Sequence, residues 1–128
     1  MNLLLDAHAL LWFLAGSSQL SGKALAGIQD MRNTIFVSPS TLWEIGIKDA
    51  LGKLCLSEPF EELFPARLDA SNILIAPILI PHLHVHRSLP FHHNDPFDRL
   101  VIAQALAEDF TVVSCDNEFP PYGVKLLW

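Results

Sequence analysis

The chain has 128 residues, 51% of them hydrophobic and 17% charged, with a net charge of −6, a composition that suits a folded globular domain and excludes a disordered chain. It contains no apolar run long enough to span a membrane, and its N-terminus lacks the basic start and long apolar stretch of a signal peptide. Cys55 and Cys115 follow no CxxC spacing, which argues against a disulfide framework or a thiolate zinc site, so we expect one cytoplasmic domain spanning residues 1–128.

Apolar runs and capping residues alternate along the chain in a way that predicts strands followed by helices. In chain order, the predicted elements are a strand at 3–5, helices at 7–14 and about 21–31, a strand at 34–37, a helix at about 39–51, one or two short helices within 58–71, a strand at 73–75, a short helix after Pro81 followed by a constrained loop, a helix from Pro96, and strands at 111–113 and 124–127. Ser38-Pro39 and Asp95-Pro96 each pair an N-cap residue with a proline at the first helical position. The alternation predicts an α/β fold with a mainly parallel central sheet of four to five strands flanked by helices.

Five acidic residues fall close to the predicted carboxyl ends of strands. Asp6 and Asp116 follow predicted strands, and Glu44 lies in the second turn of the helix after the second strand. Asp95 and Asp98 occupy the cap and first turn of the helix that is apolar nearly all round and therefore buried. Because ligands of a parallel sheet bind beyond the carboxyl ends of its strands, we expect these acids to converge.

Converging carboxylates repel one another unless a cation shares them, and a site with only oxygen ligands suits Mg²⁺ or Mn²⁺. The predicted chemistry is metal-activated water attacking a phosphodiester. Without the five clustered acids, nine acidic residues face eight basic ones, so the negative charge is largely local. It does not exclude an RNA substrate, although it argues against tight, salt-driven, nonspecific binding.

Each acid also has a purely structural interpretation. For Asp6 and Asp95, a role as helix N-cap is a sufficient explanation. The helix dipole alone favours Asp98 in the first turn of its helix, and Asp116 can belong to a turn. Glu44 and Lys48 have the favourable i,i+4 spacing of a surface salt bridge. The cluster hypothesis therefore rests on the five positions together, and Asp95 is its weakest member.

Five of the six histidines lie within residues 82–93, which raises the question of a zinc site. There is no HExxH motif and no well-placed cysteine, so we expect these histidines on the surface or in loops, with His92 or His93 near a substrate phosphate as an open alternative. The tryptophans are expected in the core or at an interface rather than as base-stacking platforms: Trp12, Trp43 and Trp128.

Four segments carry recognisable motifs: LDAHALLW at 5–12, STLWEIGIK at 40–48, HNDPFDRLVIAQA at 93–105 and SCDNEF at 114–119. Together they resemble the PIN-domain ribonucleases, and in particular the VapC-type toxins of bacterial toxin–antitoxin pairs. The resemblance implies a homodimer that cleaves RNA with Mg²⁺ or Mn²⁺ and is inhibited by a cognate antitoxin.

The resemblance also implies a set of site residues. The acidic positions of the family fall on Asp6, Glu44, Asp98 and Asp116, which are the expected catalytic and metal-binding residues. Asp6 and Asp98 are the expected primary metal ligands, Glu44 and Asp116 complete the shell and orient water, and Asp95 is auxiliary. The remaining expected site residues are polar or basic: Ser38, Ser40 or Thr41 near Glu44, Ser114 near Asp116, and Arg99, which either pairs with an acid, contacts phosphate or has a structural role. Two positions depart from the pattern, because Asn94 and Cys115 stand where basic residues are common.

Three functions compete on this basis. The leading hypothesis is a metal-dependent endoribonuclease of the VapC type. The alternative is a PIN-like protein-binding module with weak or no nuclease activity, motivated by the acidic charge and the missing basic residues at Asn94 and Cys115. A DNA-directed flap nuclease is less consistent with the chain, which lacks extra helical and basic elements.

Overall fold

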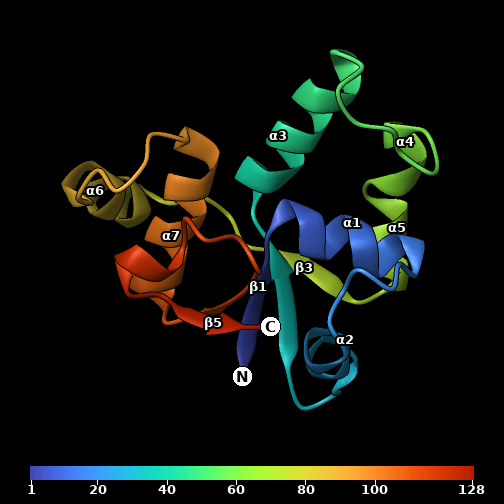
Figure 1. The fold of residues 1–128 in the computed structure, drawn as a ribbon, viewed down its shortest axis with the longest axis horizontal. Coiled ribbons are helices and arrows are strands. Elements are labelled where there is room, and N and C mark those ends of the chain that lie inside the picture. Colours follow the sequence, from blue (N-terminus) through green and yellow to red (C-terminus); the bar gives the residue numbers. More distant parts are fainter.

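Five strands form the central sheet of the computed structural model, which describes all residues 1–128 (Figure 1). Every strand pair is parallel, and the strand order is β3-β2-β1-β4-β5. The strands are β1 (Asn2–Leu5), β2 (Thr34–Val37), β3 (Ile73–Ile75), β4 (Thr111–Val113) and β5 (Lys125–Leu127). The helices are α1 (Ala7–Ala15), α2 (Gly22–Gln29), α3 (Pro39–Ala50), α4 (Phe60–Leu63), α5 (Ala66–Ala70), α6 (Ile80–Ser88), α7 (Pro96–Glu108) and the 3₁₀ helix η1 (Pro120–Tyr122). The predicted α/β fold with a parallel sheet is confirmed.

Local capping chemistry explains where the main helices begin. The Ser21 and Ser38 hydroxyls accept backbone N–H groups at the starts of α2 and α3, at 3.0 and 3.1 Å. Asp95 Oδ1 accepts two N–H groups at the start of α7, at 2.9 and 3.1 Å. Each cap satisfies donors that the first turn of a helix leaves unpaired, which is why short sequence patterns predicted these starts.

The sheet separates two hydrophobic cores. Leu3 and Leu5 of β1 point to one face, where α1, α2, α3, α4 and α5 contribute buried side chains. Leu4 points to the opposite face and packs with α7. In Figure 1 the blue-to-green helices accordingly lie on one side of the sheet, and α6 and α7 on the other. Because β1 is covered on both faces, its sequence is a continuous apolar run rather than an alternating one.

Three details of the structure differ from the predictions. Helix α6 begins at Ile80, one residue before Pro81, and η1 was not predicted. His82 was expected on the surface or in a loop, which is wrong, since it lies in α6 and is 2% exposed. Its Nδ1 accepts the Leu79 N–H at 3.0 Å, and its Nε2 lies 2.8 Å from Glu108 Oε1. The contact between His82 and Glu108 joins α6 to the end of α7.

None of the helices has the length and apolar character needed to cross a membrane.

Candidate active site

Five carboxylates line one cavity of about 110 Å³ at the carboxyl edge of the sheet. They come from the end of β1, from α3, from the cap and first turn of α7, and from the loop after β4: Asp6, Glu44, Asp95, Asp98 and Asp116. The other lining residues are Ala7, His8 and Lys48. The structure therefore brings together all five acids that the sequence analysis selected, and the parallel topology is the reason, because every strand ends at this edge.

Asp6 both caps a helix and lines the cavity. Its Oδ1 accepts the Ala9 N–H at 2.8 Å and caps α1, while the side chain lines the cavity. Burial raises the pKa of Asp6, and the nearby Ser114 hydroxyl and the Ala9 N–H offset part of that rise. A negative charge here is therefore costly without a cation to share it.

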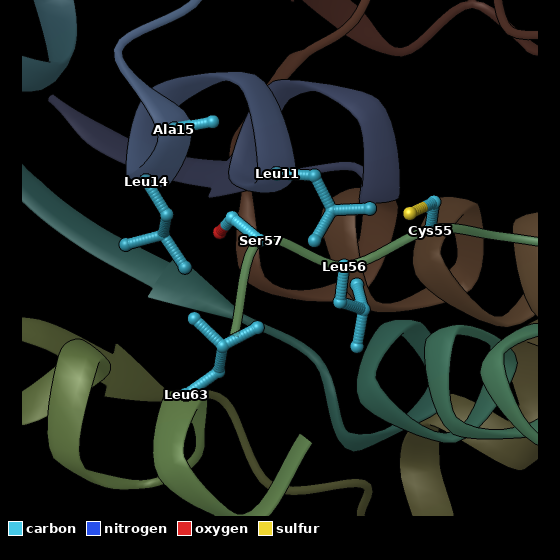
Figure 2. Close-up of a pocket in the computed structure, with 7 residues that line it drawn as sticks. All are labelled: Leu11, Leu14, Ala15, Cys55, Leu56, Ser57 and Leu63. Carbon is cyan, nitrogen blue, oxygen red and sulfur yellow. The ribbon is translucent and has the colours of Figure 1, made fainter. Parts of the chain in front are cut away.

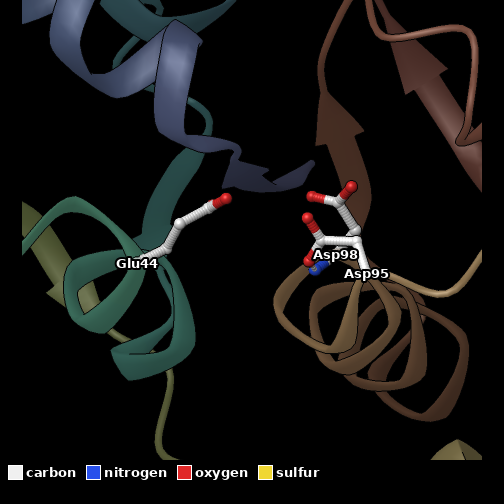
Figure 3. A group of neighbouring side chains, drawn as sticks. All are labelled: Glu44, Asp95 and Asp98. Carbon is white, nitrogen blue, oxygen red and sulfur yellow. Dashed lines mark hydrogen bonds between the residues drawn. The ribbon is translucent and has the colours of Figure 1, made fainter. Parts of the chain in front are cut away.

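Three of the five acids form a tight group. Glu44, Asp95 and Asp98 each offer an oxygen, and these oxygens lie within 4.8 Å of one another. Figure 3 shows Glu44 projecting from α3 toward the two aspartates at the start of α7. Asp95 was the weakest candidate from sequence because its cap role sufficed. The structure shows that the two roles are compatible, since only Oδ1 accepts the N–H groups that begin α7.

Asp98 is the most perturbed member of the cluster. Burial, reinforced by the nearby charges of Asp95, Glu44 and Asp116, raises its pKa to about 7, although a hydrogen bond from His93 acts in the opposite direction. Near neutral pH the metal-free carboxyl is therefore partly protonated. A divalent cation in the cluster would remove this penalty and release the proton.

Lys48 lines the acidic cavity, although from sequence it was considered only as a salt-bridge partner of Glu44. Its Nζ lies 3.1 Å from Glu44 Oε2, and its side chain is about half exposed, so the predicted i,i+4 salt bridge exists. Glu44 nevertheless is buried and lines the cavity, and Lys48 lines it too. Glu44 thus makes the salt bridge and also lines the cavity. The i,i+4 spacing from Glu44 was the signal that could have placed Lys48 here.

The predicted serine and threonine residues support the site rather than line it. Ser38, Thr41 and Ser114 are buried and absent from the cavity wall. Ser114 accepts the Asp116 N–H at 3.0 Å and so shapes the loop that carries that acid. Ser40, also buried, donates to the Phe97 carbonyl at 3.1 Å and joins α3 to α7, the two helices that supply the tight group.

Arg99 takes the structural role, and neither pairs with an acid nor reaches the cavity. It is 3% exposed, and its guanidinium donates to the carbonyls of Pro90 and Leu89 at 2.8 and 3.2 Å. It also donates to the Tyr122 hydroxyl at 3.0 Å and lies 4.1 Å from the centre of the Phe91 ring. Arg99 thereby fixes residues 89–93 against α7. A contact with substrate phosphate is excluded by this burial.

The donor set fits a hard divalent cation. All the converging side-chain atoms of the tight group are carboxylate oxygens, and their spacing of at most 4.8 Å is compatible with shared coordination of one small ion. Histidine and thiolate groups, which zinc prefers, do not join a cluster of three potential ligands anywhere in the chain. The chemistry of the residues present therefore favours Mg²⁺ or Mn²⁺ over zinc.

We expect the metal-free protein to lose stability as the pH rises through about 7. The folded-state pKa of Asp98 is about 7, above its usual 3.8, so between these values the folded state binds more protons than the unfolded state. The contribution of Asp98 to the free energy of unfolding is fully present below its pKa in the unfolded state, and it is lost as the pH rises through its pKa in the folded state. We expect the free energy of unfolding to fall by about 1–2 kcal/mol. This value is smaller than the full pKa shift would give, because the carboxyl group is partly solvated.

Urea unfolding in EDTA between pH 5 and 8 measures this effect. The control is Asp98→Asn, which should remove this part of the pH dependence, and Mg²⁺ should reduce it in the parent. An identical pH profile for parent and variant in EDTA would contradict the prediction.

The comparisons with known proteins agree with this geometry. The family model of the PIN domain matches residues 3–125. A curated relative, Ribonuclease VapC16 of Mycobacterium tuberculosis, is 38% identical over 61 residues, which is 47% of this chain and 42% of that protein. The matched segment thus spans less than half of the relative's length.

Several solved structures share the fold. VapBC2 from Rickettsia felis, bound to a DNA fragment from their promoter, aligns over 98% of this chain and 97% of its own with a TM-score of 0.73 and 17% identity. FitAcB from Neisseria gonorrhoeae aligns over 97% of this chain and 95% of its own with a TM-score of 0.66 and 21% identity. With the family model matching nearly the whole chain, and the five acids gathered at one edge of a parallel sheet, the protein belongs to the PIN-domain family.

Proposed function

We propose that the protein is a metal-dependent endoribonuclease of the VapC type. The observation that carries this proposal is the convergence of five carboxylates on one cavity at the carboxyl edge of the sheet. Such a cluster is unstable in the absence of a cation, and the raised pKa of Asp98 expresses that instability. The partial match to a protein named as a ribonuclease supports RNA as the substrate class.

The residues divide into three roles. Glu44, Asp95 and Asp98 would hold Mg²⁺ or Mn²⁺, with Asp6 and Asp116 on the flanks of the cavity. When bound, the cation supplies activation of water and stabilisation of negative charge on the phosphodiester. Lys48 lies beside the cluster with its side chain half exposed, and it provides a positive charge for an RNA phosphate.

Lys48 also bears on the two departures from the family pattern. Asn94 and Cys115 are both exposed, and neither offers a positive charge near the site. The single lysine in the cavity wall supplies part of that missing charge from α3. The alternative function is a protein-binding module with weak or no nuclease activity. It remains to be tested, because the missing positive charges at Asn94 and Cys115 weaken the attraction for phosphate.

A cognate antitoxin would dock on an apolar pocket between α1, α4 and residues 55–57. Leu11, Leu14 and Ala15 of α1, together with Leu63 of α4, face the 55–57 segment across a cavity of about 210 Å³ (Figure 2). An apolar antitoxin segment fits such a lining. The DNA-bound similar structure contains VapBC2, and we infer by analogy that this chain also works with a partner protein.

A second copy of the chain would use the apolar face between α3, α6 and α7. Trp43 is 65% exposed and packs edge-on against Phe97, with ring centres 5.1 Å apart. Leu83 of α6 and Leu100 of α7 line the same hollow. An exposed tryptophan in such a hollow is typical of an interface, which supports the expected homodimer. Cys55 and Cys115 are both free and exposed.

The proposed activity is tested by incubating a mixed total-RNA pool with the protein in Mg²⁺, in Mn²⁺ and in EDTA. We expect discrete cleavage products that require the metal and that disappear in Asp6→Asn. Asparagine keeps the oxygen that caps α1, so this variant removes charge from the cavity while preserving the helix start. Adding a DNA competitor distinguishes an RNA-directed nuclease from a DNA-directed flap nuclease, because DNA would strongly inhibit RNA cleavage only by a DNA-directed enzyme.

The outcome decides between the two functions. Cleavage that needs metal and Asp6 establishes the nuclease, and the mapped product ends name its target. A folded, metal-loaded parent that leaves every RNA intact would contradict the nuclease proposal and favour the protein-binding module.

A further inference from the structure

We propose that Tyr122 and His93 form a directional hydrogen-bond chain that orients Asp98 for a cation, and that Arg99 fixes the direction of the chain. His93 and Tyr122 are positioning residues in this proposal, since neither lines the acidic cavity. The inference rests on one part of the proposed function, namely that the carboxylate cluster binds a cation, and it does not require RNA cleavage. It deepens that function by assigning residues outside the carboxylate cluster.

The Tyr122 hydroxyl is the centre of the chain. Arg99 Nη1 lies 3.0 Å from this oxygen and the His93 backbone nitrogen lies 3.2 Å from it. A guanidinium and a backbone N–H can only donate, so together they occupy the two lone pairs of the phenol oxygen. The single phenol hydrogen must then be donated elsewhere.

That hydrogen goes to the ring of His93. His93 Nδ1 lies 2.7 Å from the Tyr122 hydroxyl, whereas the His93 carbonyl oxygen lies 3.4 Å away. The shorter contact is the stronger hydrogen bond, so Nδ1 is the acceptor. An accepting Nδ1 means that the ring hydrogen resides on Nε2.

The hydrogen-bond chain from Tyr122 through His93 ends at the carboxylate of Asp98. His93 Nε2 lies 3.2 Å from Asp98 Oδ2, and with its hydrogen on Nε2 the ring donates to that oxygen. Asp98 Oδ1 receives no hydrogen bond from the protein. One oxygen of Asp98 is thus held by the chain, and the carboxylate is restrained in a single orientation with its other oxygen available to a ligand.

Arg99 sets the direction in which hydrogens are donated along the hydrogen-bond chain. Its guanidinium cannot act as an acceptor, and it is anchored by the carbonyls of Leu89 and Pro90. The neighbouring His92 provides a contrast within the same segment. It packs edge-on against Tyr122 at 4.8 Å between ring centres, but it is exposed and makes no hydrogen bond to an acid.

Residues that hold a metal ligand through a hydrogen bond typically contribute about 10–100-fold to metal affinity. We therefore expect His93→Ala to weaken Mn²⁺ binding by about 10–100-fold, and Tyr122→Phe, which keeps the ring, by about 3–10-fold. His93→Gln retains an N–H donor on a side chain of similar reach and should restore binding to within about threefold of the parent. The matched control, His92→Ala, should bind Mn²⁺ as the parent does.

A spectroscopic measurement separates positioning from packing. Two-bond ¹H–¹⁵N correlation spectra of the metal-free parent at pH 8 should show the His93 ring hydrogen on Nε2. In Tyr122→Phe the preference should weaken toward a mixture of the two ring forms, because the donor to Nδ1 is gone. A purely structural role for Tyr122 would change the melting temperature and leave the ring form of His93 untouched.

The outcomes are distinct from those of the RNA-cleavage test. The ring hydrogen on Nδ1 in the parent, or parent-like Mn²⁺ affinity in a folded His93→Ala, would overturn the proposal, as would a parent that binds no Mn²⁺. A parent that binds Mn²⁺, shows the Nε2 form and depends on His93, but cleaves no RNA, would contradict the nuclease function while supporting this inference.

Discussion

Asp98→Asn is expected to abolish RNA cleavage, with a loss of kcat/KM on the order of 10³-fold, and at the same time to make the metal-free protein more stable at pH 8. The substitution replaces one carboxylate oxygen with an amide and changes little else in shape. It removes an oxygen ligand from the tight group with Glu44 and Asp95, so the cation is bound less firmly.

The gain in stability has the same electrostatic origin. Burial and the charges of neighbouring acids raise the pKa of Asp98 to about 7, so at pH 8 a metal-free folded protein carries an unfavourable negative charge there. A neutral asparagine relieves that repulsion, and its oxygen still accepts from His93. Opposite effects on activity and on metal-free stability are the signature of a residue kept for function.

The matched control is Asp109→Asn at the far end of the same helix. Asp109 ends α7 with a positive φ of 57°, and it pairs with Lys125 at 2.8 Å on the exposed surface. The variant has the same net charge as Asp98→Asn and tolerates that backbone conformation. We expect it to keep parental activity and stability within about 0.5 kcal/mol. Asp98→Asn with more than a tenth of parental activity would refute the assigned role.

Arg99→Met is the second large effect, an expected destabilisation of about 2–4 kcal/mol. Methionine keeps the length of the apolar stem but removes every donor of the guanidinium. The carbonyls of Leu89 and Pro90 and the Tyr122 hydroxyl then lose their charged partner in a mostly buried setting. Relief from burying a positive charge offsets part of this cost, which is why the expected value is not larger.

Urea unfolding at pH 7 measures this loss, and Arg99→Lys serves as the graded comparison. A lysine keeps the charge but lacks the planar fork that reaches three acceptors at once, so we expect an intermediate stability. His86 provides an independent readout, because burial and then the charge of Arg99 lower its pKa. In Arg99→Met the pKa of His86 should rise, as followed by NMR titration. A stability loss below about 1 kcal/mol would show that the segment 89–93 needs no such anchor.

The start of each main helix and the first strand were predictable because their causes are local. An apolar run that ends in Asp6 predicts a buried strand, and Ser38-Pro39 and Asp95-Pro96 predict helix starts. The hydrogen bonds that realise these caps join residues two or three positions apart. Short-range patterns contain all the information that such contacts require.

The gathering of the five acids was also predictable, for a reason of topology. Alternating strands and helices imply parallel strands, and parallel strands all end at one edge, so residues that follow them must meet there. The prediction did not need the strand order β3-β2-β1-β4-β5, which is set by long-range pairing. From sequence Asp95 was the weakest member because its N-cap role was a sufficient explanation, whereas the structure places Asp95 in the tight group with Glu44 and Asp98.

By itself, the sequence determined the fold class, the helix starts and which acids share an edge, because periodicity, capping and strand direction are properties of neighbouring residues. The tertiary structure alone decided which side chains meet across long separations. His93 reaches Tyr122 29 residues away, His82 reaches Glu108 26 residues away, and Arg99 reaches Tyr122 23 residues away. These contacts depend on how helices and loops pack on the sheet, and burial then requires each of these polar groups to have a hydrogen-bond partner.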